Sequence, residues 1–458
     1  MRPYTALVSR ALFPLHEKLK GHDSTARLRA LEQSQWWPAD HLAQYRLQRL
    51  RAFLHHAQTH VPYYRQVFAE AGVTPSNIGS LTELERIPCL TKAIIRAHSD
   101  RLRSKIAGPL KRYNTGGSSG EPLVFFMGKD RISHDVAAKW RATRWWGVDI
   151  GDPEIVIWGS PIELGGQDRL KAVRDRVLRS HLLPAFEMSE HNVAGFIDTI
   201  RRIQPRMVFG YPSALAHIAN YAHDHGKRLD DVGIRVAFVT SERLYDHQRA
   251  LIQQVLGCPV ANGYGGRDAG FIAHECPSGG MHLSAEDIIV ETVDSQGRST
   301  RAGEAGEIVV THLATGDFPF IRYRTGDVGM LDDTPCACGR GLPMLKEIQG
   351  RTTDFVIAQD GTVLHGLALI YVMRDLPGIK QFKIVQERID FTRVLIVPDT
   401  HYDPGSSARI EEAFKQRLGR GVLISVECVA ELPPERSGKY RYVTSHVKAA
   451  QAKEAMAQ

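Results

Sequence analysis

The stretch RYNTGGSSGEPLV, residues 112–124, is dense in glycine, serine and threonine and overlaps the apolar run LVFF at residues 123–126. Glycines let the backbone bend tightly and turn its N–H groups toward one point. The hydroxyls of Thr115, Ser118 and Ser119 add donors, and together these groups suit a polyphosphate. A flexible turn between strands explains the same composition, and no Gly-Lys-Ser/Thr follows to make a Walker loop. Four motifs further along the chain favour the phosphate-binding interpretation.

The composition is that of a globular protein with more than one domain. The chain has 458 residues, of which 43% are hydrophobic and 24% charged, and about 100–200 residues per domain predicts at least two domains. The formal net charge is +7, with 58 lysines and arginines against 51 acids. This charge is spread along the chain, which suits an anionic small ligand better than a nucleic acid. We therefore expect no nucleic-acid partner.

The sequence indicates neither a membrane span nor a disulfide framework. No apolar run approaches the roughly 18 residues of a transmembrane segment. The N-terminal segment MRPYTALVSRALFPLHEKLKG contains Arg10, His16 and Glu17, unlike a signal peptide. It fits a helix docked on the core, and the alternative is an amphipathic helix that touches a membrane or a partner. Six cysteines in a chain of this length favour a reducing cytoplasm. The oligomeric state is not decided, and a homodimer stays open.

Helices are expected first, and strands that alternate with helices follow. Residues 24–72 carry helical patterns, and Thr91 is the expected N-cap of the helix KAIIRAH. Between about 113 and 330, buried strands such as EIVIWGS (154–160) and GIRVAFVTSE (233–242) alternate with helical segments. This order predicts a largely parallel sheet with functional residues at the carboxyl ends of its strands.

The pattern changes near residue 350, at the polar run GRTTD. Short strands and helices follow, and Asp360-Gly361 between two short apolar runs is a hairpin signal. We therefore predict an α/β chain with a large N-terminal α/β domain at residues 1–350, built of mixed sheets and an N-terminal helical part. A small C-terminal α+β domain is predicted at residues 355–458, with the boundary at 351–354.

Five motifs follow one another in a characteristic order: TGGSSGEPL (115–123), GYGGRDAG (263–270), YRTGD (323–327), GRTTD (350–354) and SGKYRYV (437–443). Together they resemble the adenylate-forming superfamily of acyl-CoA synthetases and adenylation domains. VPYYR (61–65) and CACGRGLP (336–343) are similar to the phenylacetate–CoA ligase group and its CapK-like relatives. The resemblance implies that residues 351–354 are a hinge and that the small domain is a mobile lid.

The resemblance also implies an activity. A carboxylic acid attacks ATP, which gives an acyl-adenylate and pyrophosphate, and the acyl group then passes to a thiol, above all that of coenzyme A. Nothing in the sequence excludes an amide-forming ligase that uses an amine as the acceptor. A non-catalytic nucleotide-binding paralogue is the third reading, and the presence of both Asp327 and Lys439 argues against it. The identity of the acid is not indicated.

Roles for single residues follow from the same resemblance. Asp327 would accept the ribose hydroxyls, and Arg351 would face the ribose or a phosphate. Lys439 would bridge the attacking carboxylate and the α-phosphate as the catalytic residue. Asp268, where the family usually has glutamate, would hold Mg²⁺. The ATP site would be completed by Tyr264 and Gly265 beside the adenine and by the phosphate loop of Thr115, Gly116, Gly117, Ser118, Ser119 and Gly120.

Four further residues have the chemistry of a metal site. Cys276 and His282 lie in ECPSGGMH, and Cys336 and Cys338 lie in CACG. Thiolates and an imidazole are good Zn²⁺ ligands, and four of them close a tetrahedral structural site. Unrelated free thiols are the alternative, and His274 is a competing ligand.

The acyl pocket is the least defined part. By resemblance it would be lined by Trp158, Tyr211, Ser241 and Glu242, and Trp145, Trp146 and Phe238 would add aromatic walls that favour a flat acid. Plain core packing explains aromatic residues on strands equally well. Arg322 and Arg324 lie near Asp327 and are either electrostatic helpers or part of a solvated strand face.

Overall fold

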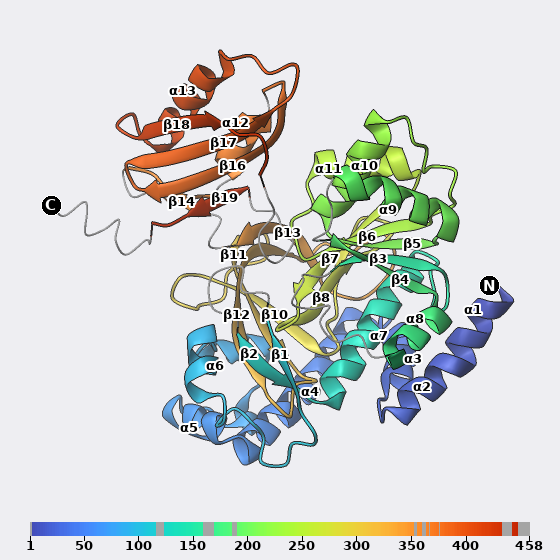
Figure 1. Ribbon diagram of the computed structural model, residues 1–458. Coiled ribbons are helices and arrows are strands. Elements are labelled where there is room, and N and C mark those ends of the chain that lie inside the picture. The colour runs from blue at the N-terminus through green and yellow to red at the C-terminus, as the bar shows by residue number, and fades with distance from the viewer. Residues whose placement is uncertain are drawn as a thin grey trace. The chain divides into compact units, whose positions relative to one another are not determined.

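The computed structural model describes residues 2–115, 123–158, 169–185, 190–351, 355–359, 363–365, 367–374, 376–432 and 442–447. The chain divides into two compact units, Met1–Gln349 and Gly350–Gln458, which are described separately below (Figure 1).

The larger unit begins with helices, as the sequence predicts. They are α1 (Pro3–Leu7), the π-helical turn η1 (Val8–Leu12), α2 (Phe13–Leu19), α3 (Ser24–Ser34), α4 (Ala39–His60), α5 (Pro62–Glu70) and α6 (Lys92–His98), with the 3₁₀ turns η2 (Pro75–Asn77) and η3 (Leu81–Arg86). Thr91 caps α6, because its Oγ1 accepts from the Ile94 N–H at 3.2 Å. Val8 and Phe13 are buried in a cluster with Leu28 of α3. The first helix is therefore docked on the core, as predicted.

One mixed sheet of eleven strands forms the centre of the larger unit. Its order is β10-β11-β12-β13-β9-β8-β7-β6-β5-β3-β4. Strands β4, β3, β5, β6 and β7 run parallel, whereas β7, β8, β9 and β13 pair antiparallel, as do β10, β11 and β12. The parallel half is the alternating region that the sequence predicts, and its central strands β5 and β6 are buried along their whole length.

The bounds of these strands are β3 (Glu154–Trp158), β4 (Ser180–Pro184), β5 (Met207–Gly210), β6 (Val236–Thr240), β7 (Val260–Gly266), β8 (Gly270–Glu275), β9 (Met281–Leu283), β10 (Ile288–Val293), β11 (Gly306–His312), β12 (Phe320–Asp332) and β13 (Met344–Arg351). The helices between them are α7 (Lys129–Trp145), α8 (Arg169–Leu178), α9 (Glu190–Ile203), α10 (Pro212–Asp224) and α11 (Asp246–Leu256).

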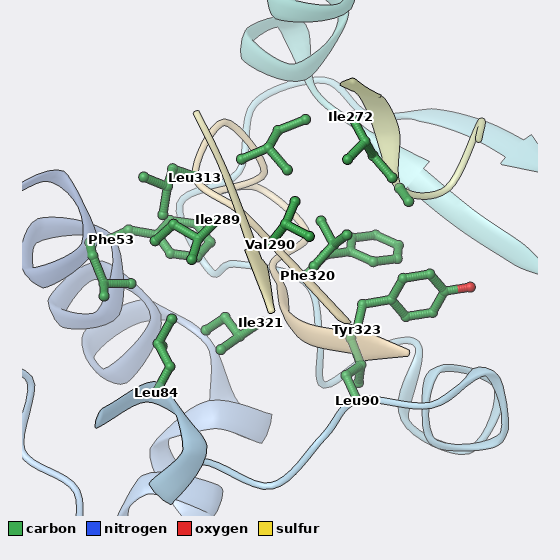
Figure 2. Packing of buried hydrophobic residues seen from close by; sticks show 14 of the residues in the cluster. Phe53, Leu84, Leu90, Ile272, Ile289, Val290, Leu313, Phe320, Ile321 and Tyr323 are labelled. Atoms are coloured by element: carbon green, nitrogen blue, oxygen red, sulfur yellow. The ribbon is translucent and has the colours of Figure 1, made fainter. Parts of the chain in front are cut away.

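The largest core surrounds the start of β12. Figure 2 shows Phe320, Ile321 and Tyr323 packed among side chains of β10, α4 and the segment around Leu84 and Leu90. Main-chain bonds join this segment to β12, because Leu90 N donates to Arg322 O and Arg324 N donates to Leu90 O, both at 2.9 Å. The start of β12 is thus bonded to β11 on one side and to Leu90 on the other, before the strand reaches Asp327.

The smaller unit is α+β. The hairpin of β14 (Phe355–Ile357) and β15 (Val363–His365) confirms the turn signal, although residues 360–362 themselves lie outside the described residues. A four-stranded sheet has the order β18-β17-β16-β19, from β16 (Ile379–Arg388), β17 (Phe391–Pro398), β18 (Leu423–Cys428) and β19 (Val443–Ser445). Helices α12 (Leu367–Arg374) and α13 (Ser406–Leu418) bury Leu369 and Phe414 against it. The predicted fold class is correct.

Across the part of the chain that the structure describes, no helix has both the length and the apolar character that a membrane crossing requires.

Candidate active site and a cysteine–histidine cluster

The ends of the glycine-rich loop are tied together. Strands β1 (Lys111–Asn114) and β2 (Val124–Met127) pair antiparallel. Beyond them, Thr115 N donates to Leu123 O and Leu123 N donates to Thr115 Oγ1, each at 3.0 Å. The loop therefore starts and finishes at one point, as a phosphate cradle requires. Of the residues predicted to bind phosphate, Thr115 lies here, while Gly116, Gly117, Ser118, Ser119 and Gly120 lie outside the described residues.

Tyr264 and Asp327 come together from two strands that are not neighbours in the sheet. The phenol of Tyr264, on β7, donates to Asp327 Oδ2 on β12 at 2.9 Å. Asp327 N donates to Thr325 Oγ1 at 3.1 Å, which orients the acid from the other side. Burial, together with the negative charge of Asp327, holds the pKa of Tyr264 well above its ordinary value. Tyr264 therefore stays a neutral donor that fixes the carboxylate.

Asp268 is held by a residue that the sequence analysis left without a role. The phenol of Tyr323, buried on β12, donates to Asp268 Oδ2 at 2.6 Å. Asp268 Oδ1 accepts from Ala269 N at 3.1 Å. The buried guanidinium of Arg131 donates to the carbonyls of Asp268 and Arg267 at 3.3 Å each. These bonds fix both the carboxylate of Asp268 and the turn between β7 and β8 that carries it.

This turn also touches the glycine-rich loop. Arg267 Nη1 donates to the carbonyl of Asn114, the last residue of β1, at 3.1 Å. Asp268 is bonded to Tyr323, four residues before Asp327. One continuous set of contacts therefore connects the base of the loop to both acids. The sequence does hint at Arg131, because an arginine followed four residues later by an aspartate on a helix predicts an ion pair. In the structure, Arg131 and Asp135 form this pair at 2.9 Å.

Gly265 makes this arrangement possible. Strands β7 and β8 pair with a register shift between Tyr264 and Gly265. A Cβ on Gly265 would lie 2.1 Å from Gly270 O, closer than any real contact. Only glycine fits this bulge, which brings the backbone back sharply enough for one short turn to carry Asp268.

The residues predicted for the acyl pocket follow the parallel strands. Trp158 ends β3 and stacks on Tyr211 with ring centroids 4.5 Å apart. Ser241 comes directly after β6 and has a left-handed backbone, with φ +71°. Glu242 Oε2 accepts from Ser213 N at 3.1 Å, in the first turn of α10. Because the strands are parallel, these residues lie toward one edge of the sheet, the edge at which a ligand binds in open α/β folds.

The other predicted aromatic walls have different surroundings. Trp145 stacks edge-on against His282 and donates from its indole nitrogen to Gln35. Trp146 donates to the carbonyl of Glu275, and Phe238 is buried in the core. Trp145 therefore belongs to the packing around the cysteine cluster described below.

Arg322 corrects one expectation. It is neither a helper at the nucleotide nor part of a solvated face, because its guanidinium is buried and binds Glu291 at 3.0 Å. Arg324, half-buried, pairs with Glu307 at 2.6 Å. Arg351 ends β13, but its side chain lies outside the described residues, as do residues 352–354 and Lys439.

Cys276, His282, Cys336 and Cys338 come together. Their ligand atoms all lie within 4.8 Å of one another. The Cys276 and Cys336 sulfurs are 3.7 Å apart, and two Zn–S bonds of about 2.3 Å at a tetrahedral angle require about 3.8 Å. His282 Nδ1 donates to Leu342 O at 3.3 Å, so its Nε2, 3.1 Å from Cys338 Sγ, presents a lone pair.

The protonation of this cluster suits a metal ion. Burial lowers the pKa of His282 to about 4, so the imidazole is neutral at pH 7. Burial also raises the pKa of Cys276 to about 11, which a bound cation would reverse. His274, the competing ligand, points elsewhere and stacks on Phe271 with centroids 5.6 Å apart. The donor set therefore fits one tetrahedral Zn²⁺.

A second group, His134, Asp135 and His312, also lies within 4.8 Å but does not fit a metal. His312 Nδ1 accepts from Ala314 N at 3.3 Å, so in the neutral ring Nε2 carries the proton. Arg131 already binds both oxygens of Asp135. This group is a network of polar side chains between α7 and the end of β11.

Comparison with known proteins agrees with this geometry. Residues 356–446 match the model of the CapK C-terminal domain. Protein CapK of Staphylococcus aureus is 23% identical over 405 residues, which are 88% of this chain and 88% of that protein. Phenylacetate-coenzyme A ligase of Pseudomonas putida is 28% identical over 347 residues, 73% of this chain and 76% of that protein.

Solved structures share the fold. A crystal structure of 2-hydroxyisobutyryl-CoA ligase in the postadenylation state superimposes with a TM-score of 0.74 at 21% identity, covering 93% of this chain and 94% of that one. The sequence resemblance is thus confirmed: the chain is a relative of CapK and of the phenylacetate-coenzyme A ligases, and it has the fold of adenylate-forming CoA ligases.

Proposed function

We propose that this protein uses ATP to convert a carboxylic acid to an acyl-adenylate with release of pyrophosphate, and then transfers the acyl group to the thiol of coenzyme A with release of AMP. The observation that carries the proposal is the set of contacts joining the glycine-rich loop, Asp268 and Asp327. Two phenylacetate-coenzyme A ligases match 73% and 84% of the chain, beside the 88% matched by CapK, and the solved ligase binds an acyl-adenylate analogous to the proposed intermediate.

Each acid has a distinct role in this proposal. Asp327 accepts the two ribose hydroxyls, because a carboxylate is the natural bidentate acceptor for a diol. Tyr264 keeps that carboxylate in place through the 2.9 Å bond and covers the adenine. Asp268 binds Mg²⁺, which needs few carboxylates when phosphate and water oxygens complete its shell. Tyr323 fixes the orientation of the Asp268 carboxylate through a 2.6 Å hydrogen bond.

The phosphates are assigned to the loop 115–120, with Arg351 at the ribose or a phosphate. Charge builds on the equatorial oxygens during in-line attack on phosphorus, so positioned donors stabilise the transition state. Lys439 of the small domain adds the cation between the attacking carboxylate and the α-phosphate. We further propose that the domains are residues 1–350 and 355–458, and that the small one rotates about 351–354 to remove Lys439 after adenylation.

We also propose one structural Zn²⁺ held by Cys276, His282, Cys336 and Cys338, supported by the sulfur spacing and by the tautomer of His282. Such an ion would fix the turn after β8 to the loop between β12 and β13 without taking part in the reaction. A reducing, cytoplasmic environment is consistent with six cysteines that are all free thiols.

The proposal is tested by ATP–pyrophosphate exchange in the presence of Mg²⁺ and a panel of aryl, aliphatic and amino acids. Exchange that depends on one class of acid is expected, and Asp327→Ala should abolish it. Arg393→Ala, which removes an ion pair in the smaller unit, serves as the matched control. No exchange from folded protein with any acid would overturn the proposal. Once an acid is known, competition between coenzyme A and amines identifies the acceptor.

A further inference from the structure

The outer face of the N-terminal helix is apolar. Four of its leucines are exposed, namely Leu7 by 52%, Leu12 by 37%, Leu15 by 57% and Leu19 by 81%. They are half of the large exposed hydrophobic residues in the described part of the chain. Such a concentration on one element marks an interaction surface, because exposed apolar side chains are normally scattered singly.

The π-helical turn η1 aligns these leucines. Its i→i+5 bonding brings Leu7 and Leu12, five residues apart, to the same side of the helix. Leu12, Leu15 and Leu19 then follow at steps of three and four along one α-helical face. Packing does not require this stripe, because the core is contacted by the opposite face, through Thr5, Val8, Phe13 and Glu17.

Basic residues flank the stripe and exposed acids are absent from it. Arg2, Arg10, Lys18 and Lys20 are exposed on this helix. Its one acidic residue, Glu17, is buried and accepts from the Ser24 hydroxyl at 2.5 Å. The outward face of residues 2–20 therefore carries apolar and positive side chains and the partly exposed His16, whose pKa is lowered by burial, and it has no exposed acid.

The positive charge extends beyond the helix. On one side, a groove of about 1070 Å³ is lined by Arg2, Arg10, Arg29, Arg144, Arg206 and Arg235. Glu32 and Asp149 in its lining both bind Arg144, which therefore adds no net charge to the groove, and Asp152 accepts from the Thr5 hydroxyl. At the end of the helix, Lys20 lies near Lys111 and near Arg174 of α8, and Arg174 is paired with Asp175 at 2.5 Å. The leucine stripe thus lies among more positive than negative side chains.

We propose that this face binds the surface of a membrane that contains anionic phospholipids. The helix would lie in the plane of the interface, with the leucines at the boundary of headgroups and acyl chains and the arginines and lysines at the phosphates. Charge complementarity selects this occupant over a second copy of the chain. Symmetric pairing through the stripe would bring the basic flanks of both copies against each other.

The test is co-sedimentation of the full-length protein with large vesicles of phosphatidylcholine, with or without about one-third phosphatidylglycerol. Binding is expected to the anionic vesicles and should weaken as salt is raised. Leu15→Glu with Leu19→Glu should lower the partition coefficient at least about tenfold, and so should Arg10→Glu with Lys18→Glu. Leu423→Glu, at an equally exposed leucine of the smaller unit, is the matched control and should bind as wild type.

Three results would overturn the proposal. The first is no binding of the wild type to anionic vesicles. The second is binding that the leucine variant retains or that the Leu423→Glu control loses equally. The third is a wild-type dimer, by light scattering, that the leucine variant converts to a monomer, because the stripe would then be covered by a second copy. Thermal unfolding of each variant, expected within about 2 °C of wild type for exposed sites, checks that the fold is intact.

Discussion

Replacing Arg322 by methionine should destabilise the larger unit strongly. The side chain is 2% exposed and binds the carboxylate of Glu291. It also donates to three main-chain carbonyls, those of Glu85 at 3.1 Å, Ile87 at 2.8 Å and Gly297 at 2.8 Å. Removal of one partner from a buried ion pair costs about 3–5 kcal/mol, and methionine restores none of the bonds to the carbonyls. We therefore expect a loss of about 4 kcal/mol in the free energy of unfolding.

The variant should also acquire a characteristic pH dependence. Burial raises the pKa of Glu291 even with Arg322 present, and without the cation nothing opposes that shift. Between the unfolded pKa, near 4.5, and the raised folded pKa, the native state binds more protons than the unfolded state. Stability then falls as pH rises through this window, by up to about 1.4 kcal/mol per pH unit. Glu291→Gln added to the same variant should remove this slope and recover at least about 1 kcal/mol.

Urea unfolding followed by tryptophan fluorescence measures both effects. All six tryptophans lie between residues 36 and 158, so the signal reports on the larger unit alone. Arg324→Met, which removes a half-buried pair with Glu307, is the matched control and should cost about 1 kcal/mol or less. A loss below about 1 kcal/mol for Arg322→Met, or a double variant no more stable than the single one, would refute this account of Arg322.

Three further predictions concern the metal, the mobile lysine and pH. Elemental analysis of protein prepared without added metal should find one zinc per chain and none after Cys336→Ser with Cys338→Ser, and chelation should lower thermal stability; wild type without zinc contradicts the assignment. Lys439→Ala should slow adenylation on the order of 10²–10³-fold but spare acyl transfer from a supplied acyl-adenylate, whereas Asp327→Ala should impair both half-reactions. If Lys439→Ala slows adenylation and acyl transfer equally, the lysine is not a mobile residue of the first half-reaction. Burial lowers the pKa of His312 to about 3, so this imidazole stays neutral in the folded protein while the unfolded chain takes up a proton as the pH falls; the free energy of unfolding should therefore drop by about 2 kcal/mol between pH 7.5 and 5. His312→Asn, which keeps an acceptor for Ala314 N, should remove that part of the pH dependence, and an unchanged pH dependence in this variant contradicts the assignment.

Local patterns in the sequence were sufficient for most elements of the fold. Helix α4 was predicted from apolar residues at steps of three and four, because a helix of 22 residues has one long buried face. The cap at Thr91 and the hairpin around residue 360 depend on contacts between residues three to ten positions apart, which the local sequence encodes directly. The parallel half of the sheet follows from the alternation of strands with helices.

Long-range polar contacts could not be read in the same way. The bond between Tyr323 and Asp268 joins residues 55 positions apart, and no local pattern indicates it. The sequence left two interpretations of Arg322, an electrostatic helper at the nucleotide or part of a solvated face in which polar and apolar residues alternate along the strand. Its left-handed φ of +49° and the register shifts between β11 and β12 break that alternation. The partner, Glu291, is on β10, which is separated from β12 by a whole strand.

Strand β12 carries a consequence for how this protein can evolve. Within eight residues it holds the centre of the largest core, the buried arginine and the acid assigned to the ribose, from Phe320 to Asp327. A substitution at the buried residues that support the proposed ribose acid would also lower stability, so selection would remove it before any new activity could be tested. Trp158 and Tyr211 belong to a separate core around the parallel strands. We therefore expect lineages of this protein to diverge in the acids they accept through the parallel edge, while β12 stays nearly unchanged.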